Sequence, residues 1–184
     1  MTVGALDLLP ALEHPELLAE PVFALLSTLP PALAASVSVA AIDPGLADTA
    51  AFCERYGVGL DVSANCVIVA GRRGETTTYA ACMVLATTRA DVNGVVRQLL
   101  DARKASFAPM DDAVALSGME YGGITPIGLP PEWPILIDSR IVALPRIIVG
   151  SGLRRSKIAL PGAALASLPG ARVVEGLARP APAI

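Results

Sequence analysis

Two glycine-containing stretches of this sequence could offer backbone N–H groups to a ligand. The first is the segment 121–131, Tyr-Gly-Gly-Ile-Thr-Pro-Ile-Gly-Leu-Pro-Pro, and the second is Gly-Ser-Gly at 150–152. A glycine lacks Cβ, so its amide can approach a ligand closely, while Pro126 stiffens the first stretch. Amides in such turns can hold an oxyanion, the charged oxygen that forms when water attacks an ester. With Asp138 at the end of the strand expected between them, the two stretches predict one shared cleft.

Several other kinds of catalytic site are not expected. There is no GxxxxGK[ST] and no GxGxxG between a strand and a helix, which argues against nucleotide hydrolysis and dinucleotide redox chemistry. The only histidine is His14, so a Ser-His-Asp or Cys-His mechanism would have to recruit it from the N-terminal segment. The three cysteines, Cys53, Cys66 and Cys82, have no CxxC spacing. We therefore expect reduced thiols and no metal site.

The sequence around the glycine stretches predicts strands and helices in mixed order. Strands are predicted over 37–42, 65–70, 76–86, 135–138 and 146–149. Helices are predicted over 14–26, from Asp48 to Arg55 with a stop at Gly57, from Asp91 to Lys104, from Asp111 or Asp112 to Gly118, and over 163–168. The connection 71–75 has the length of a hairpin loop, and its apolar flanking strands should lie near the middle of the fold. This order favours an α/β or α+β domain with a mixed, mostly antiparallel sheet.

Composition and charge narrow the class of protein. The 184 residues are 53% hydrophobic but only 4% aromatic, so one aliphatic core is expected. Residues 21–42 carry no charge, yet Pro30 and Pro31 interrupt them, so we expect a cytoplasmic protein without a membrane span. The net charge is −7 over residues 1–64 and +6 over residues 140–184. The basic part could form a local phosphate-binding face, or its charges could simply be scattered over a solvated surface.

One stretch of the sequence resembles a known family. The segment 118–129, written Gly-x-x-x-Gly-Gly-Ile-Thr-Pro-Ile-Gly-Leu, is similar to the signature of the YbaK/prolyl-tRNA deacylase family, the editing domains associated with aminoacyl-tRNA synthetases. The neighbouring pieces agree in order: Ala-Asn-Cys-Val-Ile-Val at 64–69, Leu-Ile-Asp at 136–138 and Val-Gly-Ser-Gly at 149–152. The resemblance covers residues 55–175.

The resemblance implies a fold and a division of the chain. The fold would be a YbaK-like single α/β domain, in which a mixed, mostly antiparallel β-sheet or barrel is surrounded by short helices. Residues 1–177 would form this domain, with residues 1–54 as an N-terminal extension packed on it. Residues 178–184, which are rich in Ala and Pro, would form a flexible tail.

The resemblance also implies an activity. Members of the family hydrolyse the ester between a wrong amino acid and the terminal ribose of tRNA, without a metal or organic cofactor. This chain would accordingly be a deacylase of tRNA misacylated with a small amino acid such as Ala, Ser, Cys or Pro. Its partner would be the acceptor end of the tRNA, with an aminoacyl-tRNA synthetase as a further candidate and with no DNA or membrane partner. Whether the protein is a monomer or a homodimer stays open.

The residues that match the family pattern define the expected site. The catalytic groups would be Asn65, Gly123, Asp138 and Gly150. Substrate would be bound by Gly122, Ile124, Thr125, Pro126, Ser151 and Gly152. The tRNA phosphates would be contacted by Arg154, Arg155 and Lys157.

Asn65 departs from the family pattern. Many members have lysine where this chain has Asn65, and an amide can donate hydrogen bonds but carries no charge and cannot act as a base. The change is compatible with a mechanism that relies on a substrate hydroxyl or amine, with an altered amino-acid specificity, or with a non-catalytic binding module that recognises an aminoacyl or nucleotide group. An esterase or amidase for small molecules, using the same amides, is a further alternative. The only lysines are Lys104 and Lys157, and the sequence does not show whether either replaces the missing charge.

Overall fold

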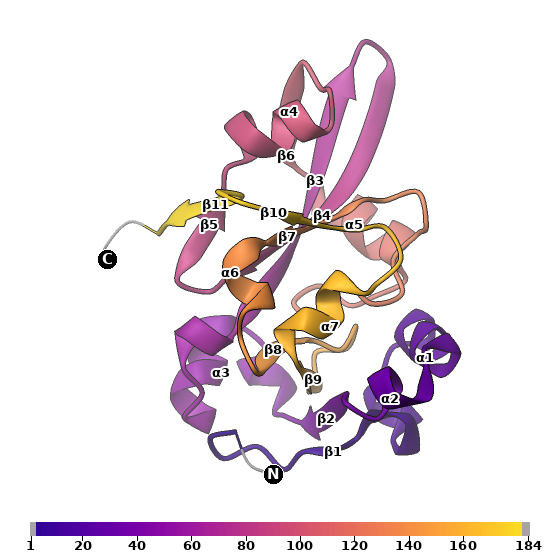
Figure 1. The fold of residues 1–184 in the computed structure, drawn as a ribbon, viewed down its shortest axis with the longest axis vertical. Helices are drawn as coiled ribbons and strands as arrows, with labels where there is room; N and C mark the ends of the chain where they lie inside the picture. Colours follow the sequence, from indigo (N-terminus) through magenta and orange to yellow (C-terminus); the bar gives the residue numbers. More distant parts are fainter. Residues whose placement is uncertain (1–2, 182–184) are drawn as a thin grey trace.

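The computed structural model describes residues 3–181, which form three β-sheets with short helices around them (Figure 1). The five-stranded sheet has the order β10-β7-β4-β3-β6, and the four-stranded sheet has the order β1-β2-β9-β8. A two-stranded sheet pairs β11 with β5. The strands are β1 (Leu9–Pro10), β2 (Ser38–Ala41), β3 (Ala64–Arg73), β4 (Thr76–Leu85), β5 (Thr88–Ala90), β6 (Lys104–Phe107), β7 (Ile135–Asp138), β8 (Ile147–Gly150), β9 (Ser156–Leu160), β10 (Ala171–Val174) and β11 (Ala178–Pro180).

The helices are short and cover the sheets. They are α1 (Glu20–Thr28), α2 (Pro31–Ala34), α3 (Thr49–Tyr56), α4 (Arg97–Leu99), α5 (Met110–Ser117), α6 (Ser139–Val142) and α7 (Gly162–Ala166). A π-helical turn, η5 (Val92–Val96), leads into α4, and 3-10 turns occur at η1 (Ala11–Glu13), η2 (Pro15–Leu17), η3 (Pro44–Leu46) and η4 (Leu60–Val62).

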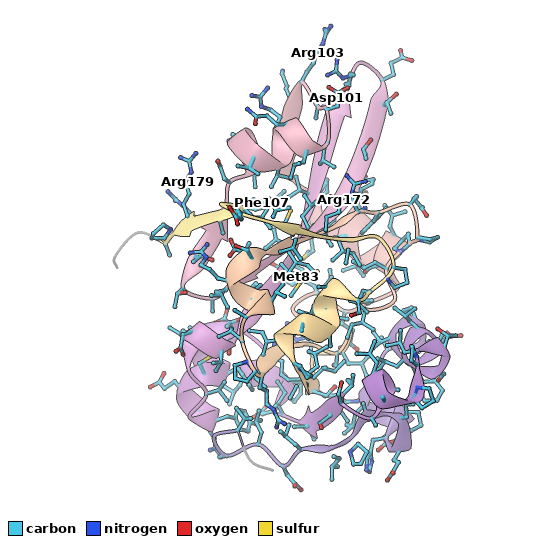
Figure 2. The ribbon with its side chains drawn as sticks, viewed as in Figure 1. Met83, Asp101, Arg103, Phe107, Arg172 and Arg179 are labelled. Carbon is cyan, nitrogen blue, oxygen red and sulfur yellow. The ribbon has the colours of Figure 1, made fainter. Side chains whose placement is uncertain are left out.

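The expected hairpin is the longest pairing in the molecule. β3 and β4 pair over ten residues each, from Ala64 opposite Leu85 to Arg73 opposite Thr76. β3 therefore extends three residues further toward the loop than the sequence predicts, whereas β4 begins at Thr76 as predicted and ends one residue earlier, at Leu85. The loop shrinks accordingly to two residues, and Gly74 adopts the positive φ of +61° that this tight turn requires. The far end of the hairpin projects beside α4, with Asp101 and Arg103 at the same end of the molecule (Figure 2).

The mixed, mostly antiparallel character of the predicted fold is confirmed. β7 runs parallel to both β4 and β10, and the remaining strand pairs are antiparallel. The alternative of a barrel is wrong for the described residues, because each sheet keeps two edge strands and does not close. A single bridge between Ser63 and Ile148 links the start of β3 to the four-stranded sheet.

Three of the predicted helices differ from the observed ones. The segment 14–26 is not one helix, because the 3-10 turn η2 ends at Leu17 and α1 begins only at Glu20, with Pro21 in its first turn, and continues to Thr28. The segment from Asp91 ends its helical part at Leu99, and Lys104 instead begins β6, where it pairs with Arg72 at the edge of the sheet. Asp101, with φ of +49°, makes the turn between them. Helix α5 has Pro109 at its N-cap, so neither aspartate is the cap. Asp111 and Asp112 lie instead in the first turn, where their negative charges interact favourably with the positive end of the helix dipole. The predicted cap of α3 by Asp48 and its stop at Gly57 are confirmed.

The two ends of the chain add strands to the sheets. β1 and β2, from the expected N-terminal extension, belong to the same sheet as β8 and β9. The sequence predicts a flexible tail from residue 178, but Ala178–Pro180 forms β11 antiparallel to β5, because its backbone finds an unpaired strand edge there. Residues 182–184 of that tail lie outside the described residues. No helix within residues 3–181 has the length and apolarity that a membrane crossing needs.

The core is aliphatic, as the composition indicates. The largest cluster fills the space between the two main sheets and α1, a second lies under η5 and α4, and a third lies between α3 and the four-stranded sheet. These clusters hold α3, β3 and β8 in fixed relation, and a cavity opens between them.

Candidate functional site

A cavity of about 590 Å³ lies between the start of β3, the start of α3, the loop before residue 125 and the end of β8. Six of the residues expected at the site line it: Asn65, Gly122, Ile124, Gly150, Arg154 and Lys157. Apolar side chains from β3 and α5 form much of the remaining wall, including those of Ile68 and Ala113. A volume in the range of about 300–1,000 Å³ is typical of sites for small molecules.

Asn65 is held in the cavity by the helix α3. The hydroxyl of Thr49, the first residue of α3, donates a hydrogen bond to Asn65 Oδ1 at 2.6 Å. Asp48 accepts from the N–H of Ala50 and caps the same helix, so the helix start is fixed beside β3. The contact from Thr49 occupies the carbonyl side of the Asn65 amide, which leaves its NH2 group to donate.

The two glycine stretches meet through their backbones. Gly123 N–H donates to Glu120 O at 2.9 Å, and Gly123 O accepts from Gly152 N–H at 2.8 Å. A Cβ on Gly123 would lie 2.6 Å from the carbonyl carbon of Leu153, and a Cβ on Gly150 would collide with Gly123 O. The two stretches therefore meet through close backbone contact that only glycine permits, and residues of both line the same cavity, although Asp138, expected in that cleft, does not.

Not every amide of these stretches is free. The N–H groups of Gly123 and Gly152 are used inside the loops, as described above. Those of Gly122 and Ile124 have no hydrogen-bond partner within residues 3–181, and both residues line the cavity. Gly122 and Ile124 can therefore supply the donors for a developing negative charge.

The three basic residues of the segment 154–157 have different surroundings. Arg154 is half-buried at the cavity, where its guanidinium donates to Tyr121 O at 3.1 Å and to Pro44 O at 3.0 Å. Arg155 is exposed outside the cavity and donates to Glu16 O at 2.8 Å. Lys157 is buried inside the cavity wall, and its Nζ donates to Ala47 O at 3.1 Å. Lys157 is thus placed for contact with a molecule in the cavity rather than with a surface phosphate.

Asp138 lies outside the cavity. It ends β7, and its carboxylate accepts from Arg140 Nε at 2.7 Å and Nη2 at 2.8 Å and from the N–H of Ala178 at 3.1 Å. Burial by itself raises the pKa of Asp138, but these hydrogen bonds and the charge of Arg140 outweigh it, so the pKa is lowered overall. The carboxylate thereby ties β7 to α6 and β11.

Four of the six expected substrate-binding residues do not line the cavity. Thr125 is fully buried, and its Oγ1 has no partner, the one such buried side-chain atom within residues 3–181. Ser151 is also fully buried, and its hydroxyl lies 2.7 Å from that of Ser156. Pro126 lines a separate apolar groove beside α1. Gly152, with φ of +84°, faces Ala19. All four residues pack within the protein or against α1 and support the loops without lining the cavity.

The sequence reasoning missed several residues at the cavity. Phe107 and Tyr121 line it although 62% and 60% of their surfaces are exposed, and Met110 is similarly exposed. Phe107, labelled in Figure 2, comes from the end of β6, which the sequence assigns to no strand. Tyr121 could have been noticed from its place next to Gly122, and Thr49 from its place at a predicted helix start. Nothing in the sequence singles out Phe107.

Cys66 lines the cavity but has the wrong properties for a nucleophile. Burial raises the pKa of its thiol far above the ordinary range. The thiol therefore stays protonated at neutral pH, and a protonated thiol is a poor nucleophile. Within residues 3–181, no group of three or more His, Cys, Asp or Glu side chains is arranged to hold a metal ion.

Comparisons with known proteins point in one direction. Residues 43–168 match the family described as "Aminoacyl-tRNA editing domain". A crystal structure of a proposed trans-editing enzyme for prolyl-tRNA synthetase is similar, with a TM-score of 0.70 and 19% identity, and the match covers 85% of this chain and 94% of that one. No curated protein matches the sequence.

Two further solved structures have the same fold. One is a hypothetical protein, with a TM-score of 0.70 and 18% identity over 80% of this chain and 95% of that one. The other comes from work on epitope grafting onto scaffold proteins, with a TM-score of 0.70 and 20% identity over 85% of this chain and 95% of that one. At these identities the structural likeness establishes the fold alone.

Proposed function

The chain belongs to the aminoacyl-tRNA editing domain family, and from this premise we propose that it hydrolyses the ester of tRNA misacylated with a small amino acid. The observation that carries the proposal is the cavity itself. It brings together Asn65, Gly122 and Gly150, which are distant in sequence and which stand at positions that the family resemblance implies to be functional. The cavity is large enough for an aminoacyl group and part of the terminal nucleoside.

The free backbone amides would stabilise the reaction's charged intermediate. Water attacks the ester carbonyl carbon, and the carbonyl oxygen becomes negatively charged. The N–H groups of Gly122 and Ile124 have no other partner within residues 3–181 and would donate to that oxygen. Preorganised donors of this kind typically contribute about 10²–10³-fold to the rate.

Asn65 would orient water or a ribose hydroxyl. Thr49 donates a hydrogen bond to its carbonyl oxygen, and this contact fixes the orientation of the amide. The NH2 group on the other side of the amide would then donate to the substrate. We assign positioning roles to Gly123 and Gly150, whose close backbone contact holds the loop. Asp138 supports the fold at a distance, through its bonds to Arg140 and Ala178.

The mouth of the cavity fits the unpaired end of a tRNA. Phe107 and Tyr121 expose aromatic rings at the cavity, and an aromatic ring can stack on any base. Arg154 lies at the same place and adds a positive charge for a phosphate. The amino acid would then reach the apolar wall, where selection by size is worth about 1–3 kcal/mol per methylene.

Single-turnover deacylation of a panel of misacylated tRNAs tests the proposal. The wild-type protein should release one amino acid or a few small ones, and Asn65→Ala should slow the release at least about 10-fold. Asn93→Ala is the matched control, because Asn93 is the chain's only other asparagine and is exposed on η5. A Gly123 variant is less informative, since a side chain there would displace Leu153.

Two results would count against hydrolysis. Equal release by a mock preparation that lacks the protein would show that a contaminant releases the amino acid. Tight binding of aminoacyl-tRNA without any release would favour the alternative, a non-catalytic binding module with the same cavity.

A further inference from the structure

Lys157 carries a buried positive charge that the described protein does not neutralise. Only 7% of its surface is exposed. Its Nζ donates to Ala47 O at 3.1 Å and lies 5.4 Å from the centre of the Phe52 ring. No carboxylate within residues 3–181 forms an ion pair with it. An ammonium has three N–H donors, so two remain after the bond to Ala47.

The side chain of Lys157 leaves the sheet on the side of the cavity loop. Lys157 of β9 is directly opposite Gly150 of β8, and residues directly opposite in an antiparallel pair point to the same face. A Cβ at Gly150 would collide with Gly123 O and lie 2.7 Å from Ile124 O, so the loop covers that face. The ammonium and the free amides of Gly122 and Ile124 therefore border one cavity.

The charges that line the cavity favour an anion. They are Asp48, Arg154 and Lys157, two positive and one negative. The carboxylate of Asp48 caps α3, and the guanidinium of Arg154 bonds to two backbone carbonyls. Burial lowers the pKa of Lys157, because the protein does not fully replace the water that would solvate the ammonium. A negative charge on a bound molecule would supply that missing partner.

We propose that Lys157 is a catalytic residue of this cavity, whose ammonium donates a hydrogen bond to the ester carbonyl oxygen as that oxygen becomes negative. The inference rests on the proposed hydrolytic function and deepens it, because it provides the positive charge that Asn65 cannot. It also moves Lys157 from the expected tRNA-phosphate contacts to the reacting group.

The reaction balances without a cofactor. The oxygen of water bonds to the carbonyl carbon, the C=O electron pair moves onto the carbonyl oxygen, and the attacking water passes a proton to a solvent water, from which a proton later returns to the leaving ribose oxygen. The C=O bond then forms again, the bond from carbon to the ribose oxygen breaks, and that ribose oxygen takes up a proton. The products are a free amino acid and a tRNA with its ribose hydroxyl restored. Lys157 remains an ammonium throughout.

The first test separates the chemical step from binding. In single-turnover deacylation, Lys157→Met should lower the rate constant at saturating protein about 10²–10³-fold, while the half-saturating protein concentration changes less than about threefold. Lys157→Arg keeps the charge and should restore part of the rate. Lys104→Met is the matched control, because Lys104 is the only other lysine and is exposed on β6. A rate for Lys157→Met within about twofold of wild type overturns the proposal.

A second test does not depend on hydrolysis. The probes are two stable adenosine derivatives that both carry an α-amine. One has a 1-aminoethylphosphonate ester at the 3′ position, whose phosphonate is negatively charged, and the other is 3′-amino-3′-deoxyadenosine with an alanyl amide, whose amide group is uncharged. Calorimetry with the wild-type protein should give at least about tenfold tighter binding of the phosphonate, since it resembles the charged intermediate. Lys157→Met should abolish that preference, and Lys104→Met should keep it.

The two tests distinguish failure of the inference from failure of the proposed function. If Lys157→Met retains the preference for the phosphonate, Lys157 does not bind the negative oxygen, whatever the hydrolysis assay gives. If the wild-type protein hydrolyses no tRNA but prefers the phosphonate through Lys157, hydrolysis is wrong and the anion site stands. If the wild-type protein hydrolyses no tRNA and binds neither probe, both proposals are overturned.

Discussion

Asp138 and Lys157 are the two charged residues buried within residues 3–181, and their surroundings are opposite. Asp138 is 1% exposed and is surrounded by donors from Arg140 and from the backbone of Ala178. Lys157 has one backbone carbonyl and one aromatic ring near its charge, and an open cavity beside it. A buried charge with all its partners serves the fold, whereas a buried charge without an opposite charge is available to a ligand.

The largest expected effect comes from removing the paired charge. Asp138→Ala should lower the free energy of unfolding by about 3 kcal/mol, because it leaves Arg140 without its partner and the N–H of Ala178 without an acceptor. Urea denaturation at pH 7 measures this, and Asp111→Asn, at an exposed site, is the control. A loss below about 1 kcal/mol would show that the Asp138–Arg140 pair contributes little to stability. Asp138 and Lys157 would then not differ in their contribution to the fold.

Acid should abolish the stabilisation by Asp138. The pKa of its carboxyl is lowered in the folded state, so its contribution is complete well above the unfolded value of about 3.9 and disappears as pH falls through the folded value. The difference in unfolding free energy between wild-type and Asp138→Asn proteins should therefore narrow steadily below pH 5. A difference that stays constant down to pH 2 contradicts this account.

The next largest effect is expected from disturbing the backbone contact between Gly150 and Gly123, beside Lys157. Gly150→Ala should lower stability by about 2 kcal/mol and reduce deacylation strongly, because its Cβ collides with Gly123 O and displaces the loop that carries Gly122 and Ile124. Gly45→Ala is a suitable control, since its nearest atom would be Asp43 Oδ1 at 3.2 Å. Thermal unfolding and single-turnover rates measure the two effects. Full activity in Gly150→Ala would separate the loop from catalysis.

A smaller effect of opposite sign is expected at Lys157. Lys157→Met should raise the free energy of unfolding at pH 7 by about 1 kcal/mol while it lowers activity, because it removes a buried charge that the protein does not neutralise. The pKa of Lys157 is lowered in the folded state, so the cost should decline as pH rises toward about 10. Urea denaturation from pH 7 to pH 10 checks both statements. A destabilised Lys157→Met protein would make Lys157 a structural residue like Asp138.

The smallest effect concerns an uncharged group. Thr125 Oγ1 is buried without a partner, so Thr125→Val should leave stability unchanged or raise it by about 0.5–1 kcal/mol. Thr87→Val, at an exposed site, should change stability less than about 0.5 kcal/mol and serves as the comparison. A loss of more than about 1 kcal/mol in the free energy of unfolding of Thr125→Val would show that the hydroxyl forms a stabilising hydrogen bond.

Local patterns in the sequence were sufficient for several elements. Asp48 and Gly57 mark the two ends of α3, and the apolar runs on either side of the glycine-containing loop mark β3 and β4, because capping and a hairpin turn depend on near neighbours in the sequence. The end of the helix after Asp91 could not be found in this way. Lys104 belongs to a strand because Arg72 lies beside it, and that pairing is a tertiary contact.

The sequence by itself determined the family pattern, the glycines of the two loops and the absence of lysine at position 65. Only the tertiary structure decided which side chains share the cavity. It moved Asp138 away from the cavity into an ion pair with Arg140, and it brought Lys157 from β9 into the cavity with Asn65 from β3. The physical reason is that burial and charge compensation depend on the groups packed around a side chain, and those groups come from distant parts of the chain.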